Sequence, residues 1–522
     1  MDPLVLLPAA LQAFSIQMHL HGSLSEGVAS MYSSTVAAEQ AGIDVLWWSD
    51  HEYGIMHYRI PTTFGFESFA EFDWENEEWE PVAGQQSAMK FLRLRSEEDA
   101  HTATYGPPAV QGLGSFRLTS VGKTVFEFLT ERHAATARSL VGDTKLALSV
   151  LPEKGTAGVS IRLSKHPTDS LYLNYFLDND AKPSRDGNHY NIPVAFTANE
   201  WNHLVLPLSA DASAGFPEFI GDDNAIREIH FSVTDGAAHF DAMQVQFNTW
   251  YPETFQRQRD ILDELELQIP AVVQLQGVEQ SVAHHVNVFS INTEVRIPNG
   301  IGNLVTAVHA NKGLVSLNHP FGPGANADQM NRQEILDRLV ENNAYNVDIL
   351  EVGYRSRGSG ELADFFWVWD ELAKRGIHLI GTGVADIHHW GPGVNPVNNF
   401  VSWIWAESTS KPDMLKGLRS GRVFFGDITL FDGTLDIVSD TGHMGQRVYD
   451  PDATITIDGL EPDDQVTIVR DGIPVESFAG SRQVNHTVEG PGCFRVEVYT
   501  VDSTAKVFSN PLCLLDPRER KK

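Results

Sequence analysis

The chain has 522 residues and a formal net charge of −31, with 38 Lys and Arg against 69 Asp and Glu. This length exceeds what one hydrophobic core supports, so we expect two to four domains. The negative charge opposes a nucleic-acid partner, because phosphate binding needs a basic surface, and it also opposes binding to an anionic membrane. No apolar run is long enough to predict a transmembrane helix.

The N-terminal stretch and the cysteines bear on cellular location. MDPLVLLPAALQAF has no Lys or Arg before its apolar residues and contains Pro3 and Pro8. This is unlike a signal peptide and favours a cytoplasmic location. Cys493 and Cys513 lie at equal distances from a turn near residues 502–504, so they could face each other across a hairpin. With no other cysteine in the chain, we expect a buried pair of free thiols.

The first segments predict strand, helix and strand. In FSIQMHLHGSLSEG (residues 14–27), a period of two places four polar residues on one face: Ser15, Gln17, His19 and His21. A short Ala-rich helix is expected at residues 35–42, with Gly42 as its stop. IDVLWWSDH (residues 43–51) is apolar until its end, as in a parallel strand covered on both sides.

Later segments change character twice. From about Val125 to Phe247, short alternating strands are separated by turn residues without a convincing amphipathic helix, which predicts a β-sandwich. Strands then alternate with helices from Thr254 to Asp386. Short strands and turns return after residue 431.

We therefore predict an α/β fold in three parts. Residues 1–63 and 250–430 form one α/β barrel, which is interrupted by a jelly-roll-like β-sandwich at residues 64–249. A small Ig-like β-sandwich with a charged tail follows at residues 431–522.

Residues able to bind metals or transfer protons end nearly every apolar run of the predicted barrel. In a barrel of parallel strands, the C-terminal strand ends converge on one face, where active sites are built. A single buried imidazole is usually structural, but the same residue types at every strand end predict a metal site. These residues are His19 and His21, Asp50 and His51, Glu279, His319, and Asp386 and His388, while His284 and His285 start the extended piece that follows Glu279.

The motifs, in their order, resemble a known family. His-x-His with a following acid, Ser-Asp-His, Gly-Val-Glu, Asn-His-Pro and Asp-x-His are similar to the PHP superfamily (polymerase and histidinol phosphatase), over about residues 14–63 and 250–430. The resemblance implies a distorted seven-stranded (β/α) barrel with two or three metal ions. The C-terminal region and the later motifs look most like a branch called metallohydrolases, which includes carbamate-ester hydrolases.

The resemblance also implies a ligand set. His19, His21, Glu279 and Asp386 would hold one metal, Glu279 would bridge to a second with His285 and His319, and Glu26, His51 and His388 would hold a third. Imidazole and carboxylate ligands without thiolate suit Zn, Mn or Fe. Two such ions sharing a carboxylate would activate a bridging hydroxide for ester hydrolysis.

Several assignments keep an alternative. Glu26 also fits a helix capping box with Ser23, and His284 is adjacent to His285, which we favour as the ligand. His57 is either a proton donor to the leaving group or a surface histidine. Asp50 is expected to orient His51 or its neighbours rather than to bind metal.

The substrate is predicted only by class. Arg355 and Arg357 follow a strand end and could clamp a phosphate, which favours a phosphoesterase acting on a small phosphate ester that could be linked to a sugar. Two exposed loop arginines are the alternative, and Glu351 in the same strand would then support the site or balance them. A carboxylic or carbamate ester hydrolase of the same fold remains open.

The inserted sandwich resembles a carbohydrate-binding jelly roll in its strand pattern. Such a module implies carbohydrate as a further partner and a structural calcium ion near Asp241. A scaffold or dimerisation role, or a wall over the active site, is the alternative. A non-catalytic glycan-binding protein is therefore a third hypothesis, and an oligomer is compatible with all three.

Overall fold

The computed structural model describes residues 10–25, 27–52, 62–65, 92–94, 101–112, 114–128, 139–140, 144–247, 251–281, 285–291, 300–322, 331–388, 398–516 and 518. Contacts divide the chain into two compact units. The first consists of Met1–Leu20, Thr35–Glu52 and Glu266–Lys522, and the second of His21–Ser34 and Tyr53–Leu265. The predicted limits of three domains stay a prediction.

Two groups of strands build the α/β part of the first unit. One sheet begins with β13 (Val273–Gln276), β2 (Val45–Trp48), β1 (Gln12–Gln17), β21 (Phe400–Ala406) and β22 (Val423–Asp427). A second sheet contains β14 (Val278–Gln280), β15 (Val286–Phe289), β16 (Leu314–Leu317), β17 (Ile349–Gly353) and β20 (Ile380–Gly383). All residues of β2 are buried, as expected for an apolar strand that is covered on both faces.

The two sheets meet at isolated bridges rather than along continuous ladders. His51, beyond the end of β2, bridges to Glu279 in β14, and Leu20 bridges to Ile387 beyond β1 and β20. Across the described ranges only these backbone bridges join the two sheets, so the expected seven-stranded barrel stays a prediction. The α/β class is as predicted, but the strands are not all parallel, because β15 runs antiparallel to β14 and β16. The start of β15 thus shares an edge with the C-terminal end of β16.

Amphipathic helices cover these strands. They are α1 (Met31–Ala41), which crosses the division between the units, α5 (Ile301–Ala310), α6 (Arg332–Glu341), α7 (Leu362–Lys374) and α8 (Lys411–Ser420). In α7 an apolar stripe is buried: Phe365, Phe366, Trp369 and Leu372. In α6, Ile335, Leu336 and Leu339 are buried, whereas Val340 is exposed. None of the described helices is long and apolar enough to cross a membrane.

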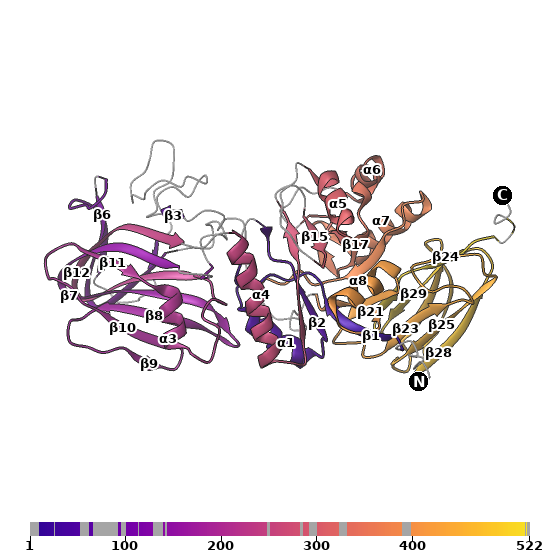
Figure 1. Ribbon diagram of the computed structural model, residues 1–522, viewed down its shortest axis with the longest axis horizontal. Helices are drawn as coiled ribbons and strands as arrows, with labels where there is room; N and C mark the ends of the chain where they lie inside the picture. The colour runs from indigo at the N-terminus through magenta and orange to yellow at the C-terminus, as the bar shows by residue number, and fades with distance from the viewer. Residues whose placement is uncertain are drawn as a thin grey trace, which may run out of the picture. The chain divides into compact units, whose positions relative to one another are not determined.

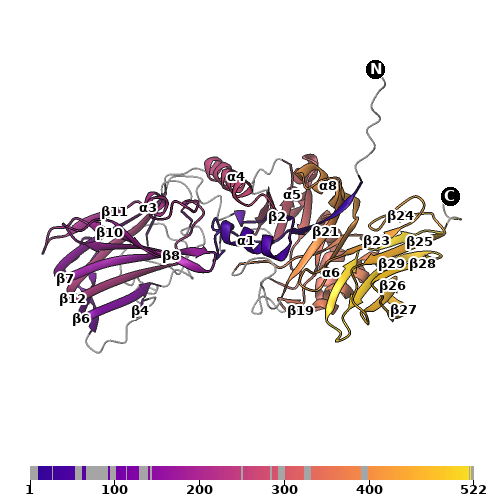
Figure 2. The ribbon, with the colours of Figure 1, turned by 90° about the horizontal axis from the view of Figure 1, so that it is seen from below.

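The C-terminal strands extend the first sheet. β22 pairs with β30 (Ala505–Ser509), and the sheet continues through β29 (Gly492–Tyr499), β26 (Gln465–Arg470) and β27 (Ile473–Ala479). β31 (Leu512–Leu514) joins it through β29, with β24 (Arg447–Val448) beside β31. A separate sheet of β23 (Thr434–Val438), β25 (Asp452–Asp458) and β28 (Gln483–Glu489) lies beside these strands (Figures 1 and 2).

The two cysteines form a disulfide. Cys493 of β29 and Cys513 of β31 are directly opposite each other in an antiparallel pair, and their sulfur atoms are bonded. The two cysteines face each other across an antiparallel strand pair, as expected, whereas the prediction of free thiols is wrong. Sequence spacing indicates the opposition but carries no information on the redox state.

The second unit is mainly one network of β-strands. Its principal strands are β6 (Ser115–Phe128), β7 (Lys145–His166), β8 (Asp169–Leu177), β10 (His189–Val194), β11 (Asn202–Leu206) and β12 (Glu228–Phe247). The network also includes β3 (Thr62–Gly65), β4 (Leu92–Leu94), β5 (His101–Gly106) and β9 (Ser184–Asp186). β7 and β12 are longer than the short strands expected here, because the turn-like residues near Lys154 and Asp235 produce register shifts within continuous strands. A short helix, α3 (Leu208–Gly215), was not predicted. The predicted helix after the sandwich is α4 (Tyr251–Gln268), whose last residues belong to the first unit.

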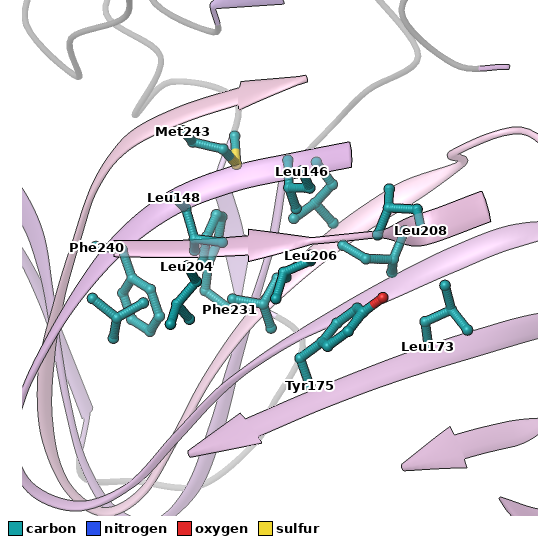
Figure 3. Close-up of a cluster of buried hydrophobic side chains, with 14 of the residues drawn as sticks. Leu146, Leu148, Leu173, Tyr175, Leu204, Leu206, Leu208, Phe231, Phe240 and Met243 are labelled. Atoms are coloured by element: carbon teal, nitrogen blue, oxygen red, sulfur yellow. The ribbon is translucent and has the colours of Figure 1, made fainter. Parts of the chain in front are cut away.

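Alternating apolar residues of these strands form the core of the second unit (Figure 3). Leu146 and Leu148 of β7 point toward Leu204 and Leu206 of β11 and toward Phe231 of β12. Burial of such aliphatic and aromatic groups contributes about 1.5–3 kcal/mol per side chain. The period-two pattern in the sequence therefore predicted a packed β-structure correctly.

Candidate metal centre

The side chain of Gln17 organises the first strand end. Its Oε1 accepts hydrogen bonds from the backbone N–H groups of His19 (3.2 Å) and Ala385 (3.2 Å). Its Nε2 donates to the carbonyl of Phe400 at 3.1 Å. One buried amide thus holds the backbone beside two predicted ligands, His19 and Asp386. Gln17 alternates onto the His19 face in the sequence, so a signal for it was present.

Predicted ligands from five chain segments meet beyond these strand ends. Within the first unit, two groups of residues have donor atoms within 4.8 Å of one another: one is His19, His319 and Asp386, and the other is Glu279, His285 and His319. Ions such as Zn²⁺ bind nitrogen and oxygen at about 2.0–2.2 Å, so adjacent ligand atoms lie roughly 3.4 Å apart. Small side-chain adjustments would bring either group to that spacing. The donor set, imidazole and carboxylate without thiolate, fits a divalent ion.

His19 lies at the middle of three carboxylates. Its Nδ1 is 2.7 Å from Oε1 of Glu351, and its Nε2 is 3.2 Å from Glu279 and 3.3 Å from Asp386. Burial opposes a charge on the ring, but the neighbouring carboxylates, Asp386 foremost, raise the pKa of His19 well above its usual value. A cation is therefore strongly favoured at this position.

Glu279 contacts residues of both groups, since its Oε2 lies 3.2 Å from Nε2 of His19. Its Oε1 lies 2.7 Å from Nδ1 of His285 and 3.8 Å from Nε2 of His319. Burial lowers the pKa of His319 to about 3, so its ring is neutral and can act as a ligand at neutral pH. Burial also opposes charge on His285, but the hydrogen bond with Glu279 raises the pKa of that ring.

His51 and His388 border the same carboxylates. Nδ1 of His51 is 2.6 Å from Oγ of Ser281 and 3.3 Å from Glu279 Oε2. Nδ1 of His388 is 3.3 Å from Asp386 Oδ1, and the two rings are 6.4 Å apart between centroids. Ser281 was not predicted, since nothing in the sequence distinguishes it from an ordinary turn serine.

Glu351 supports two candidate ligands at once. Besides its contact with His19, its Oε2 accepts hydrogen bonds from the His319 backbone N–H at 2.8 Å and from the Tyr354 hydroxyl at 2.7 Å. The structure thus favours a supporting role for Glu351 among the alternatives that the sequence left open. Such carboxylates fix the tautomer and the orientation of metal-binding imidazoles.

Two candidate ligands have backbone angles that ordinary residues avoid. Asp386 has φ of 49° and His319 has φ of 20°. Each such backbone conformation lowers the stability of the fold by about 1–3 kcal/mol. It therefore occurs mainly where the surrounding structure imposes it, as at functional sites. Their place at the centre of the cluster is consistent with a functional site.

The two arginines have different partners. Arg357 forms an ion pair with Oδ2 of Asp386, and Arg355 forms one with Asp427 and lies over the ring of Phe400. The Arg357 Nε is buried and has no hydrogen-bond partner in the part of the chain that the structure describes. Only Arg357 therefore adjoins the cluster of candidate ligands.

The remaining predicted residues are His21, Glu26, His57 and His284. His21 is the first residue of the second unit, is buried, and has Ser25 Oγ 3.5 Å from its Nδ1. Glu26, His57 and His284 lie outside the described residues. The capping box that began at Ser23 is wrong, because the helix begins at Met31.

Asp241, the predicted calcium ligand, has backbone partners. It accepts hydrogen bonds from the N–H groups of Val110, Gln111 and Ala242. These contacts anchor a loop to β12. Calcium at this position stays a prediction.

Comparisons with known proteins give limited similarity. No protein-family profile matches the chain, and no curated protein matches it either. Among solved structures, the chain is similar to a two-domain protein from Bacteroides vulgatus containing a predicted PHP-like metal-dependent phosphoesterase, at 13% identity and a TM-score of 0.27. That match covers 50% of this chain and 79% of the other.

A second similarity concerns a family 11 carbohydrate-binding module from Clostridium thermocellum, in complex with a mixed-linked tetrasaccharide. It has 9% identity and a TM-score of 0.19, covering 30% of this chain and 88% of that module. A module that binds β-1,4-galactotriose matches at 11% identity and a TM-score of 0.18, covering 30% of this chain and 86% of the other.

Proposed function

We propose that the chain is a metal-dependent hydrolase. One observation supports this most directly: three buried carboxylates and three imidazoles converge at the strand ends of the first unit. These residues are Glu279, Glu351, Asp386, His19, His285 and His319. Burying several carboxylates together is costly unless cations balance them. Arg357 and a protonated His19 supply only part of that balance.

The proposed ligands follow the sequence prediction. His19, His21, Glu279 and Asp386 would hold one ion, and Glu279, His285 and His319 a second. His51 and His388 would contribute to a third, together with Glu26. Divalent ions in such a site would lower the pKa of water and stabilise the negative charge that develops on an ester.

The chain's own residues prepare this chemistry. Glu351 would keep the proton of His19 on Nδ1, so that Nε2 faces Glu279 and Asp386 as a ligand atom. Oγ of Ser281 would fix the ring of His51 in the same way. Preset side chains of this kind lower the reorganisation needed when substrate charge develops.

We propose a phosphate ester as the substrate class. Arg357 supports this, because its Nε has no acceptor among the described residues, while its Nη2 is bound to Asp386. A guanidinium group placed beside the metal ligands suits the oxygens of a phosphoryl group. Arg355 is bound to Asp427, so we assign it no direct part in substrate binding.

A substrate panel with the reconstituted full chain tests this proposal. We expect metal-dependent hydrolysis of p-nitrophenyl phosphate, no activity in His319→Ala, and roughly tenfold or greater loss of kcat/KM in Arg357→Ala. Arg355→Ala is the matched control and should retain most activity. Hydrolysis restricted to p-nitrophenyl acetate or carbamates would replace the phosphoesterase by the alternative ester hydrolase. Absence of metal-dependent hydrolysis of every ester would contradict the enzyme proposal.

Carbohydrate binding by the second unit is a second candidate function. One outward sheet face carries Tyr172 stacked on His189, with ring centroids 4.4 Å apart and planes 11° apart. Asn174 beside them donates to Asn191, and Ser160 donates to Asn174. Flat aromatic surface flanked by amide groups suits the apolar faces and hydroxyl groups of a sugar.

Affinity electrophoresis against soluble polysaccharides tests this face. Retardation that is lost in Tyr172→Ala but kept in Val205→Ala, an exposed control on β11, would support sugar binding. Equal mobility of the wild-type chain in gels with and without polysaccharide would refute sugar binding.

A further inference from the structure

The strand β20 is the last strand of the second sheet and has one strand neighbour, β17, among the described strands. On that side the N–H of Ile380 donates to the carbonyl of Asp348 at 3.0 Å. The backbone groups of Gly381 and Gly383 point to the other side, because successive residues of a strand alternate in the direction of their hydrogen bonds. Both glycines are buried. Buried backbone groups need partners, so something other than a strand must supply them here.

Two polar side chains take the place of the missing strand. Oδ1 of Asn510 accepts a hydrogen bond from the Gly381 N–H at 2.7 Å, and its Nδ2 donates to the Gly381 carbonyl at 2.8 Å. The hydroxyl of Ser402 accepts one from the Gly383 N–H at 3.1 Å and donates to the Gly383 carbonyl at 3.0 Å. Ser402 belongs to β21, and Asn510 directly follows β30. Each side chain therefore satisfies one donor and one acceptor of the edge, as a neighbouring strand would.

Gln17 continues the same series, since its Oε1 accepts the Ala385 N–H at 3.2 Å. Asn510, Ser402 and Gln17 thus form a side-chain row that binds every second residue from 381 to 385. All three members of the row are at most 1% exposed. The next residue after the row is Asp386, whose φ of 49° is unusual for an aspartate. The row therefore holds the backbone that leads directly into a candidate ligand.

Asn510 is itself fixed in place. Its Nδ2 also donates to the Val423 carbonyl of β22 at 2.8 Å, and its backbone N–H donates to the same carbonyl at 3.2 Å. The strand that it holds packs closely on α7, because a Cβ on Gly381 would lie 2.7 Å from the ring of Trp369. Hydrogen bonds and packing together thus leave β20 little freedom to shift.

We infer that Ser402 and Asn510 are positioning residues for metal binding and act on Asp386 through the backbone of β20. The inference rests on the proposed function, in which Asp386 is a metal ligand. A left-handed backbone angle persists only where its surroundings impose it, and the row fixes the strand that precedes Asp386. All of these residues belong to the first unit. Since Asn510 lies in the C-terminal region, that region is part of the support of the metal centre.

The test compares two buried serines of the first unit. Ser402→Ala removes both hydrogen bonds to Gly383 with little change in volume. Ser509→Ala is the matched control, because Ser509 is also fully buried but its hydroxyl accepts the Val496 N–H of β29, at 2.8 Å. Asn510→Ala is a second variant, which removes another member of the row from the same strand.

A further variant identifies the ion that is affected. His285 has a donor atom in the group with Glu279 and His319, but not in the group that contains Asp386. His285→Ala should therefore weaken mainly the ion that Asp386 would not hold.

The dissociation constants of Zn²⁺ and Mn²⁺ from the full chain are measured by chelator competition. We expect Ser402→Ala to raise one constant by about tenfold or more, as for the loss of a supporting residue, and Asn510→Ala to raise the same constant. This constant should be the one that His285→Ala changes less. Ser509→Ala should bind both ions as the wild type does. Amide hydrogen exchange at Gly383 should rise in Ser402→Ala and stay unchanged in Ser509→Ala.

The opposing outcomes are distinct. Wild-type affinity for both ions in a folded Ser402→Ala variant would refute the role of the row and leave the proposed function intact. Equal losses in Ser402→Ala and Ser509→Ala would indicate general destabilisation and would also refute positioning. A loss at the ion that His285→Ala weakens would contradict action through Asp386. A wild-type chain that binds no metal would overturn the proposed function and this inference together.

Discussion

The substitution Glu351→Gln tests how the centre keeps His19 ready to bind metal. Glu351 accepts three hydrogen bonds, from Nδ1 of His19, from the Tyr354 hydroxyl and from the His319 backbone N–H. A glutamine has one acceptor oxygen and one donor group in the same volume. The backbone N–H of His319 can only donate, so the glutamine oxygen should turn toward it.

The amide group of the glutamine would then face His19. Its N–H₂ would donate to Nδ1 of that ring, and the ring proton would move to Nε2. Nε2 is the atom that lies 3.2 Å from Glu279 and 3.3 Å from Asp386, where the ion is proposed. Metal binding would require reversal of this tautomer. We expect a loss of about 10–100-fold in affinity at one ion, or about 1.4–2.7 kcal/mol.

Chelator competition on the full chain measures this loss, and ¹⁵N NMR of the imidazoles reports the tautomer of His19. Glu497→Gln is the matched control in the same unit, because Glu497 also binds a tyrosine hydroxyl, that of Tyr499, and lies far along the sheet from the candidate ligands. Unchanged metal affinity in a folded Glu351→Gln variant would refute this reasoning, as would equal losses in both variants.

Three further predictions concern stability. Replacing both Cys493 and Cys513 by Ala should lower the free energy of unfolding by about 3 kcal/mol, because their cross-link closes a loop with a separation of 20 residues; an unchanged urea midpoint would contradict this. Burial lowers the pKa of His166 from its usual 6.5 to about 4, so the unfolded chain binds the proton first and stability falls as pH falls from 6.5 to 4. His166→Gln should flatten the pH dependence of the urea midpoint over this interval, and an unaltered slope would count against the argument. Phe231→Ala in the core of the second unit should cost about 3–5 kcal/mol, against less than about 0.5 kcal/mol for the exposed Val205→Ala.

The sequence predicted which candidate ligands lie close together better than it predicted the direction and the length of the strands. His19, Glu279, His319 and Asp386 end apolar runs, and strand ends share an edge, so their meeting follows from local pattern alone. The antiparallel direction of β15 was not predicted, since apolar composition does not encode strand direction. The continuity of β7 and β12 was missed because a β-bulge and a turn use the same residue types.

The sequence also did not reveal side-chain partners that are distant from each other along the chain. The sequence placed Arg355 and Arg357 together after one strand, but their acids, Asp427 and Asp386, lie 72 and 29 residues further on and on separate segments. Asn510 is likewise 129 residues from Gly381, to which its side chain is hydrogen-bonded. Pairing over such separations depends on the tertiary fold, which periodicity does not describe. Gln17 is a different case. The sequence placed it on the same strand face as His19, but its hydrogen bonds to the backbone were not predicted.

Metal analysis of the purified full chain tests the central claim most directly. The protein is reconstituted with Zn²⁺, Mn²⁺ or Fe²⁺, freed of loosely bound ions by gel filtration, and analysed beside His319→Ala, in which the ligand shared by both groups is removed. We predict about two or more ions per wild-type chain and a clear loss in the variant. Fewer than about one ion per wild-type chain with every metal would contradict the proposal that this cluster is a metal centre.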